Sequence, residues 1–272
     1  MSDKINQAVT FLNSRGIQNP HAAIILGTGL GKMADSIRVI QSIDYREIPH
    51  FPVSTVESHS GRLIFGELSG KKVIALQGRF HYYEGYSLQE VTFPVRVLKL
   101  LGIKYLLISN AAGSLNPDFK KGLLMMIDDH INFLPDNPLR GRNDDSMGPR
   151  FPDMSCPYSS VLNRKMMEIA QREKIGLKKG VYVAVMGPNL ETRAEYRMFR
   201  NFADAVGMST VPEVIVANHM SLPCAAVSVL TDECDPENLV PAKIEDIIAI
   251  ASMAEGDLVK LFSLMIAETE LS

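Results

Sequence analysis

The sequence predicts an α/β domain built around a mostly parallel sheet, and three observations lead to this prediction. Short apolar runs recur along the chain, and each is followed by a small or polar loop and then by a helix-like segment. This alternation is typical of βαβ units. The chain has 272 residues, 46% of them hydrophobic, which is enough for one large core. The polar loops all follow expected strands, which is where open α/β sheets bind their ligands.

The expected strands are short runs rich in Val, Ile, Leu and Ala. They lie at residues 22–26, 73–76, 105–108, 181–186, 205–208 and 225–230. Two other segments, 159–175 and 244–267, instead repeat apolar residues at helical spacing. In the first of them Leu162, Met166 and Ile169 share one face. We therefore expect both segments to be helices that pack against the sheet.

Residues 135–158 interrupt this alternation. The segment contains five prolines and has little periodicity. Loops of this length in compact domains usually form lids, binding loops or interface arms, and the simpler alternative is a disordered insertion. Phe151, which stands between Arg150 and Pro152, argues against complete disorder.

Composition excludes several classes of function. The net charge is −3 and no Lys/Arg-rich run occurs, so we expect neither a nucleic-acid partner nor an anionic membrane. No apolar run approaches the roughly 20 residues of a membrane span, and the first residues lack a signal-peptide pattern. The three cysteines are too scattered for a disulfide framework, and the six histidines lack metal-ligand spacing. We therefore expect a soluble cytoplasmic protein without a metal site.

The most informative segment is residues 77–85, which follows the expected strand at 73–76. Arg79 and His81 are two residues apart, so their side chains point the same way in an extended segment. A guanidinium group matches phosphate oxygens, and a histidine adds a donor whose charge follows the protonation of the anion. The segment therefore predicts a site for a small anion. The alternative is a solvated turn with a structural Arg79–Glu84 pair.

A second candidate anion site is the glycine-rich loop at residues 27–31. Its glycines allow backbone N–H groups to approach a phosphate, and Thr28 adds a hydroxyl. The spacing is G-x-G-x-G, which departs from the G-x-G-x-x-G fingerprint of dinucleotide-binding proteins. Asp44 nevertheless stands roughly where a ribose-binding acid would, so nicotinamide binding is left as an alternative.

Two acids follow expected strands. Glu191 could open a helix, where an acid is also a plain stabilising feature. Asp232 lies just past the strand at 225–230, and its simpler role is that of an N-cap or turn residue. Two carboxylates that enter one crevice could instead perform general acid–base catalysis.

Together these motifs resemble the trimeric class of purine nucleoside phosphorylases. The matching segments run in order from about residue 20 to residue 232. They are Thr28 in its glycine-rich loop, Ser54-Thr55-Val56 with His59, and residues 78–81, 83–85, 110–113, 187–188, 191–192 and 206–213. The resemblance implies one α/β domain over residues 1–272, a three-layer α/β/α sandwich with a mixed central sheet. It also implies a homotrimer in which residues 135–158 form an active-site or interface loop.

The reaction implied by the resemblance is that of a pentosyltransferase of purine salvage. Inorganic phosphate attacks the anomeric carbon of a purine ribonucleoside or 2'-deoxyribonucleoside, and the products are the free base and the pentose 1-phosphate. Phosphate is thus a co-substrate, and neither a metal nor an organic cofactor is required. The implied catalytic residues are His81, Glu191 and Asp232.

The resemblance also assigns binding residues. The phosphate site would comprise Thr28, His59, Arg79, His81, Ala111 and Ser209. The sugar and base site would comprise Tyr83, Ala112, Gly113, Phe151, Leu190, Glu191, Met208, Thr231, Asp232 and Ile244. Among these, Phe151 matches an aromatic residue that a neighbouring subunit inserts over the sugar.

Three positions depart from the family pattern. Members that prefer 6-oxopurines carry Asn where Asp232 stands, so Asp232 is expected to favour a 6-amino group unless burial near Glu191 keeps it protonated. Leu190 replaces an aromatic residue of the base pocket. Ile244 stands where a histidine often meets the ribose 5'-hydroxyl, and an apolar residue there favours a 5'-methylthio group. A 5'-methylthioadenosine phosphorylase is therefore the alternative within the resemblance, and a nucleoside hydrolase, a nucleotide-binding sensor or a dehydrogenase are the alternatives outside it.

Overall fold

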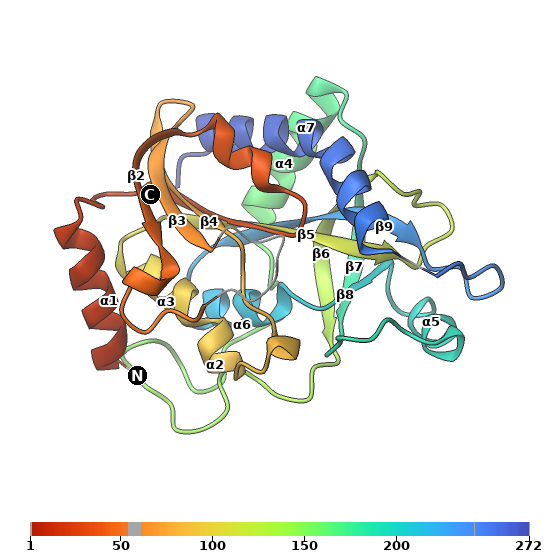
Figure 1. The fold of residues 1–272 in the computed structure, drawn as a ribbon, viewed down its shortest axis with the longest axis horizontal. Coiled ribbons are helices and arrows are strands. Elements are labelled where there is room, and N and C mark those ends of the chain that lie inside the picture. Colours follow the sequence, from red (N-terminus) through yellow and green to blue (C-terminus); the bar gives the residue numbers. More distant parts are fainter. Residues whose placement is uncertain (1, 54–60, 242, 272) are drawn as a thin grey trace.

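The computed structural model describes residues 2–53, 61–241 and 243–271, and within them nine strands form one sheet (Figure 1). The order of the strands in the sheet is β2-β3-β4-β1-β5-β8-β7-β6-β9. Their bounds are β1 Ala22–Leu26, β2 Arg38–Asp44, β3 Arg62–Leu68, β4 Lys71–Gln77, β5 Tyr105–Ser114, β6 Leu124–Asn132, β7 Leu177–Ala184, β8 Ala205–Gly207 and β9 Cys224–Glu233.

The sheet is mixed rather than mostly parallel. Strand β1 pairs in parallel with β4 and β5, whereas β3 is antiparallel to both β2 and β4. Strand β9 is antiparallel to β6 but parallel to β5. Because β9 also pairs with β5, the strands β5, β8, β7, β6 and β9 close into a ring beside the open wing formed by the other four. The alternation of elements could not indicate this closure, which joins strands far apart in the sequence.

Helices cover both faces of the sheet. The α-helices are α1 Ser2–Ser14, α2 Leu88–Val91, α3 Phe93–Leu100, α4 Ser160–Glu173, α5 Arg193–Phe199, α6 Val211–His219 and α7 Ile244–Glu268. The 3₁₀ helices are η1 Gly31–Ser36, η2 Tyr45–Glu47 and η3 Tyr82–Glu84. Figure 1 shows α4 and α7 on one side of the strands, and α1, α2, α3 and α6 on the other.

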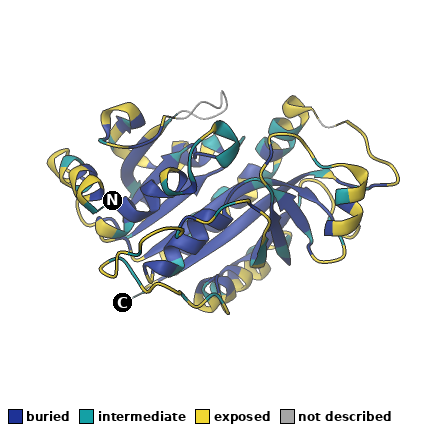
Figure 2. Cartoon of the chain, turned by 90° about the horizontal axis from the view of Figure 1, so that it is seen from below, coloured by how far each residue is buried: buried dark blue, intermediate teal, exposed yellow. Residues whose placement is uncertain are grey.

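The hydrophobic core has two layers, one on each face of the sheet. On β1, Ile24 belongs to the apolar cluster that contains residues of α4 and α7, whereas Ile25 belongs to the cluster that contains residues of α1, α3 and α6. Neighbouring residues of a strand point to opposite faces, so one strand contributes to both clusters. The buried central layer lies between partly exposed helices in Figure 2. The predicted three-layer α/β/α sandwich with a mixed sheet is confirmed.

The two predicted helices are present almost at their expected bounds. Ser159 caps the N-terminus of α4 by accepting a hydrogen bond from the Leu162 N–H group. The C-cap residue Lys174, directly after the helix, has a left-handed backbone conformation. Leu162, Met166 and Ile169 are buried on the face that packs against the sheet. Helix α7 begins at Ile244 and buries apolar residues from Ala251 onward.

Two predicted loops are strands in the structure. Residues 109–114 continue β5, and residues 231–233 complete β9. The sequence prediction ended these strands at residues 108 and 230, because polar residues follow there and a polar residue usually marks the end of a buried strand. Here the two strands pair with one another along their whole length, with a register shift between Ala112 and Gly113. The polar residues Ser109, Asn110, Ser114 and Thr231 are therefore buried within the sheet, whereas Asp232 is partly exposed and Glu233 is exposed.

Residues 133–159 contain no helix or strand, and they include the whole segment 135–158 that the sequence sets apart. The segment is held by side-chain hydrogen bonds, including Asn143 Nδ2 to the Gly148 carbonyl oxygen at 3.0 Å and Arg150 Nη1 to the Leu139 carbonyl oxygen at 2.9 Å. Elsewhere in the described part of the chain, no helix is long and apolar enough to cross a membrane.

Candidate active site

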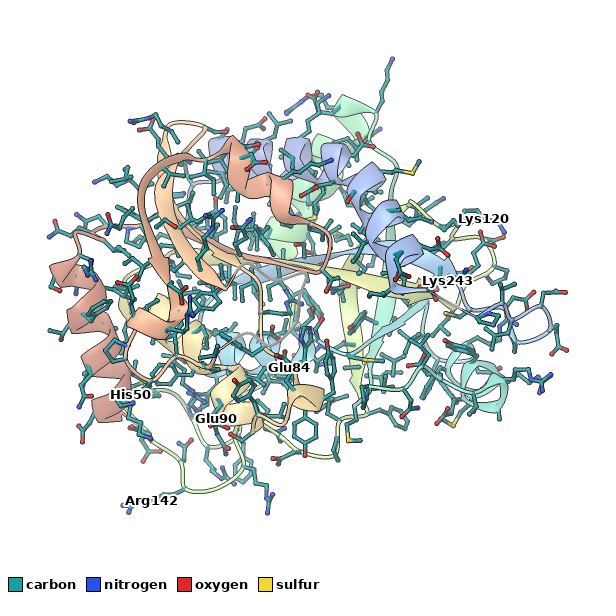
Figure 3. The ribbon with its side chains drawn as sticks, viewed as in Figure 1. His50, Glu84, Glu90, Lys120, Arg142 and Lys243 are labelled. Atoms are coloured by element: carbon teal, nitrogen blue, oxygen red, sulfur yellow. The ribbon has the colours of Figure 1, made fainter. Side chains whose placement is uncertain are left out.

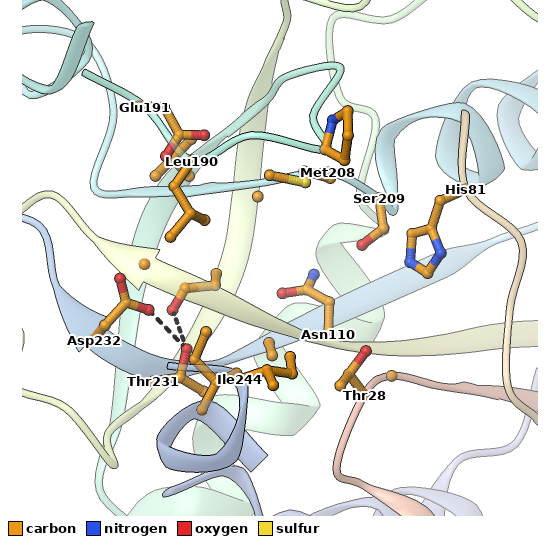
Figure 4. Close-up of a pocket in the computed structure, with 18 of the residues that line it drawn as sticks. Thr28, His81, Asn110, Leu190, Glu191, Met208, Ser209, Thr231, Asp232 and Ile244 are labelled. Carbon is orange, nitrogen blue, oxygen red and sulfur yellow. Dashed lines mark hydrogen bonds between the residues drawn. The ribbon is translucent and has the colours of Figure 1, made fainter. Parts of the chain in front are cut away.

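A cavity of about 310 Å³ opens at the carboxyl ends of β1, β4, β5 and β9 (Figure 4). The predicted site residues that line it are Thr28, Arg79, His81, Tyr83, Ala111, Ala112, Gly113, Leu190, Glu191, Met208, Ser209, Thr231, Asp232 and Ile244. They come from segments that are far apart in the sequence, and the fold brings them into one site. Two predicted residues are not among them: His59 lies outside the described residues, and Phe151 is on the 133–159 segment with 87% of its surface exposed.

Arg79 is the buried cation of the cavity, with 3% of its surface exposed. Its Nη1 donates to Ser209 Oγ at 2.8 Å, and its Nη2 donates to the Ser109 carbonyl oxygen at 2.7 Å. Its Nε lies 3.8 Å from Oε1 of Glu213, a buried acid of α6. These partners hold the guanidinium plane in one orientation beside the Ser209 hydroxyl.

Thr210 links Arg79 to the end of β5. Its hydroxyl accepts hydrogen bonds from Arg79 Nη1 at 3.1 Å and from Asn110 Nδ2 at 2.8 Å. Its φ of 70° lies in a region that a β-branched residue rarely adopts. Two buried donors on its hydroxyl stabilise this backbone conformation, which turns the chain from β8 into α6 beside Ser209.

His81 lies on the same side of the cavity as Ser209 (Figure 4). Its Nδ1 is 2.9 Å from Oε1 of Glu84, and its ring stacks on Tyr83 with centroids 4.7 Å apart. The solvated-turn alternative for residues 77–85 paired Glu84 with Arg79. In the structure the Glu84 carboxylate instead contacts the His81 ring, and it also accepts a hydrogen bond from the His81 backbone N–H group. The carboxylate and the Tyr83 ring fix the orientation of the imidazole.

Glu191 stands at the other end of the cavity. It follows β7 on the segment that precedes α5, and it is half-buried. Burial raises the pKa of its carboxyl group, the backbone N–H at Glu191 and the nearby Tyr196 hydroxyl oppose that shift, and the Asp232 charge adds to it. A second, wider cavity of about 810 Å³ shares Glu191 and Asp232 and extends toward residues 235–250. The Glu191 end of the site is therefore the more open one.

Asp232 accepts hydrogen bonds on both carboxyl oxygens. Thr231 Oγ1 is 2.9 Å from Oδ1 (Figure 4) and also lies 3.3 Å from the Ala112 carbonyl oxygen. Cys234 Sγ is 3.2 Å from Oδ2. Burial, together with the Asp232 charge, raises the pKa of the Cys234 thiol, so this thiol remains a donor at neutral pH.

Apolar side chains separate the two ends of the cavity. Leu190, Met208 and Ile244 all line it, and Figure 4 shows Met208 between Leu190 and Ser209. Met208 packs so closely on Gly187 that a Cβ atom there would lie 2.3 Å from its sulfur. A side chain at position 187 would displace Met208, and the φ of 67° at Gly187 also favours glycine there.

Sequence reasoning missed several residues of the site. Cys234 directly follows β9 and is two positions after Asp232, so in an extended segment the two side chains would point the same way, which is a signal that the sequence does contain. Glu213 is the one acid in the otherwise apolar run 211–217 of α6, which also indicates a buried partner. Tyr196 gave no such signal, since its proximity to Glu191 and Cys234 depends on the packing of α5.

The loop at residues 27–31 leads into the short 3₁₀ helix η1 rather than into an α-helix. The dinucleotide-binding arrangement places a pyrophosphate on the N-terminus of an α-helix, and this chain does not build one there. Asp44 pairs with Arg46 at the end of β2 and does not line the cavity. Among the described residues, no group of three or more His, Cys, Asp or Glu side chains is placed to hold a metal ion.

Comparison with known proteins agrees with this site. The sequence model of the Phosphorylase superfamily matches residues 21–267. The chain is 45% identical over 271 residues to purine nucleoside phosphorylase 1 of Bacillus subtilis, an alignment that covers 99% of this chain and all of the relative. The chain belongs to the purine nucleoside phosphorylase family. Another family member, from Bos taurus, is 46% identical over 96% of this chain and 93% of its own length.

Solved structures of the family share the fold. The structure of purine nucleoside phosphorylase from Schistosoma mansoni in complex with adenosine has a TM-score of 0.93 at 38% identity and covers 99% of this chain and 98% of its own. Another structure of a schistosome purine nucleoside phosphorylase, in complex with hypoxanthine, also has a TM-score of 0.93, at 39% identity, with the same coverage of both chains. Family membership replaces the dehydrogenase and the nucleotide sensor as interpretations of this chain.

Proposed function

We propose that this protein cleaves purine nucleosides with inorganic phosphate, giving the free purine base and a pentose 1-phosphate. The observation that carries the proposal is the division of one cavity into two ends. Arg79, His81 and Ser209 offer donors at one end, whereas Glu191 and Asp232 offer carboxylate acceptors at the other. Relatives at 45% identity over almost the whole chain bear the name of this activity.

The two ends suit the two halves of the reaction. Phosphate at the Arg79 end would form a bond from one of its oxygens to C1' of the sugar, while the C1'–N9 bond breaks and the purine takes the electron pair. Glycosidic cleavage passes through an oxocarbenium-like state, so a phosphate anion held against the sugar stabilises its developing positive charge. Arg79 and His81 hold the nucleophile in place, which supplies positioning as well as charge.

Glu191 and Asp232 would recognise the base. A carboxylate accepts hydrogen bonds, so Asp232 suits the 6-amino group of adenosine better than the 6-oxo group of inosine. We therefore propose that this protein accepts adenosine better than relatives that carry Asn at the position of Asp232.

The proposal includes an assembly. Phe151 is exposed and lies outside its own cavity, on the segment expected to reach a neighbouring subunit. In a homotrimer it would cover the sugar in the neighbour's site. The reaction needs no metal or organic cofactor, since charge and positioning come from the side chains and from the phosphate.

The test is a substrate panel measured with and without phosphate. Inosine, guanosine, adenosine and 5'-methylthioadenosine are each incubated with the protein, and base release is followed. We expect base release from the three nucleosides only when phosphate is present, with pentose 1-phosphate as the second product. Base release in phosphate-free buffer would instead identify a hydrolase, and cleavage of 5'-methylthioadenosine alone would identify the related phosphorylase.

A further inference from the structure

A second cavity of about 310 Å³ lies away from the candidate active site. It is bounded by α1, α3, the C-terminal end of α6 and residues 138–147 of the long loop, and it shares no lining residue with the active-site cavity. Ser209 and Thr210 precede α6 and His219 ends it, so the nine residues of this helix, about 13 Å in length, separate the two cavities.

Arg96 of α3 lines this second cavity and is almost fully buried, with 5% of its surface exposed. Its buried Nε has no hydrogen-bond partner among the described residues. A buried charge without a partner is strongly unfavourable, and native structures rarely keep one. Burial lowers the pKa of the Arg96 guanidinium, and the Asp144 carboxylate opposes this shift from beyond ion-pair distance.

His219, which is also buried, lies beside Arg96. Its Nε2 is 3.3 Å from Oδ1 of Asn143, and its buried Nδ1 has no hydrogen-bond partner among the described residues. Two further arginines, Arg140 and Arg142, form the exposed rim of the cavity. Figure 3 shows Arg142 at the outer edge of the molecule, beyond Glu90 of α2.

The charges around the cavity do not balance. Three guanidinium groups face it, whereas Asp144 is the one carboxylate among its lining residues. Arg140 is paired with Asp136, whose carboxylate lies 3.6 Å away and has 17% of its side chain exposed. Arg96 and Arg142 against Asp144 then leave one positive charge at the cavity. A net positive charge beside a buried guanidinium suits an anion such as a phosphate group.

We propose that this second cavity is a binding site for a phosphate group, either inorganic phosphate or a small phosphate monoester, with Arg96 as its main anchor. The Arg96 guanidinium would donate to two phosphate oxygens, and Arg140 and Arg142 would close over the anion from the rim. Ile5, Leu139 and Met147 leave apolar room beside the anion for the organic part of an ester. The bound anion would also fix residues 138–147 to α3 and α6.

The experiment is equilibrium dialysis of the full chain against radiolabelled inorganic phosphate, with Arg96→Gln as the main variant. Arg46→Gln is the matched control, because Arg46 is an exposed arginine paired with Asp44 on the far wing of the sheet. We expect two phosphates per chain in the wild type and in the control. In Arg96→Gln we expect affinity at the second site to fall by about tenfold or more, while the phosphate KM of nucleoside cleavage stays unchanged.

The result that would overturn the proposal is one phosphate per chain in the wild type, or two equally tight phosphates in Arg96→Gln. If Arg96→Gln does not fold, as judged by circular dichroism, the double variant Arg140→Gln/Arg142→Gln takes its place and should weaken the same site. Unlabelled ribose 5-phosphate distinguishes the two sources: displacement of the second phosphate alone indicates a monoester site, and no displacement indicates inorganic phosphate. Normal nucleoside cleavage by these variants would separate this question from the proposed function.

Discussion

The two ends of the active-site cavity are built in opposite ways. At the Arg79 end, the charged group is buried, and fixed partners from β5 and α6 hold it on several sides. At the Glu191 end, the acids are partly exposed, and the site continues into a wider cavity. The first end can present one geometry only, whereas the second can be reshaped by changing single side chains.

This difference matches the demands of the proposed reaction. Every purine nucleoside is cleaved by the same nucleophile, so the phosphate end needs rigidity. The base and the 5' group differ between substrates, so the base end must discriminate among them. Discrimination depends on which donors and acceptors find a partner, which makes Asp232, Leu190 and Ile244 the positions that select the substrate.

The largest effect is expected from Arg79→Ala. This substitution removes a buried cation and its donors beside Ser209, so kcat/KM for phosphate should fall on the order of 10²–10³-fold. The KM for the nucleoside should change much less. Initial rates measured while phosphate and nucleoside are varied separately give both values, and a larger effect on the nucleoside would contradict the assignment.

The control for Arg79→Ala concerns stability. Removing Arg79 leaves Glu213 as a buried acid without its cation, which costs about 3–5 kcal/mol of unfolding free energy. The double variant Arg79→Ala/Glu213→Gln removes both charges and should recover most of that stability. It should not recover phosphate affinity, which separates the loss of the site from the loss of the fold.

An intermediate effect is expected from Asp232→Asn at the base end. The amide can donate to a 6-oxo group, so the ratio of kcat/KM for inosine to that for adenosine should rise by about tenfold. Glu233→Gln is the matched control, because Glu233 is the adjacent acid but pairs with Lys120 on the surface. An unchanged ratio in Asp232→Asn would rule out Asp232 as the group that reads position 6 of the purine.

The two ends of the cavity also differ in how far the sequence could predict them. Arg79 and His81 belong to one short motif after one strand, so local spacing alone indicated an anion site. The two long strands β5 and β9 were predicted too short, because they continue through their polar residues by pairing with each other. That pairing joins residues more than one hundred positions apart, and no local pattern encodes it.

The base end was predicted in part. Glu191 and Asp232 were identified as acids at strand ends, and the structure brings both into the cavity. Their neighbours Tyr196 and Cys234 were missed, although Cys234 is only two positions after Asp232 and directly follows β9. Tyr196 reaches Glu191 only because α5 packs back over the end of β7, which is a tertiary contact.

The smallest effect is expected from Tyr196→Phe. The Tyr196 hydroxyl lowers the pKa of Glu191, against the larger effect of burial, so removing it should raise that pKa further. If Glu191 acts as an ionised acceptor, the acid limb of kcat/KM should move to higher pH, and the nucleoside KM at neutral pH should rise by about fivefold. Tyr86→Phe is the control, because that hydroxyl donates to the Val53 carbonyl oxygen away from the cavity.

Stability provides a second measurement for Tyr196→Phe. A carboxyl whose pKa is raised on folding contributes stability below its unfolded pKa of about 4.5 and loses that contribution as the pH rises through the folded value. Raising the pKa of Glu191 further should therefore cost unfolding free energy at neutral pH and little near pH 4. Denaturant unfolding of wild type and variant at both pH values measures this difference. An equal loss at both pH values would mean that Tyr196 supports packing alone and does not act through Glu191.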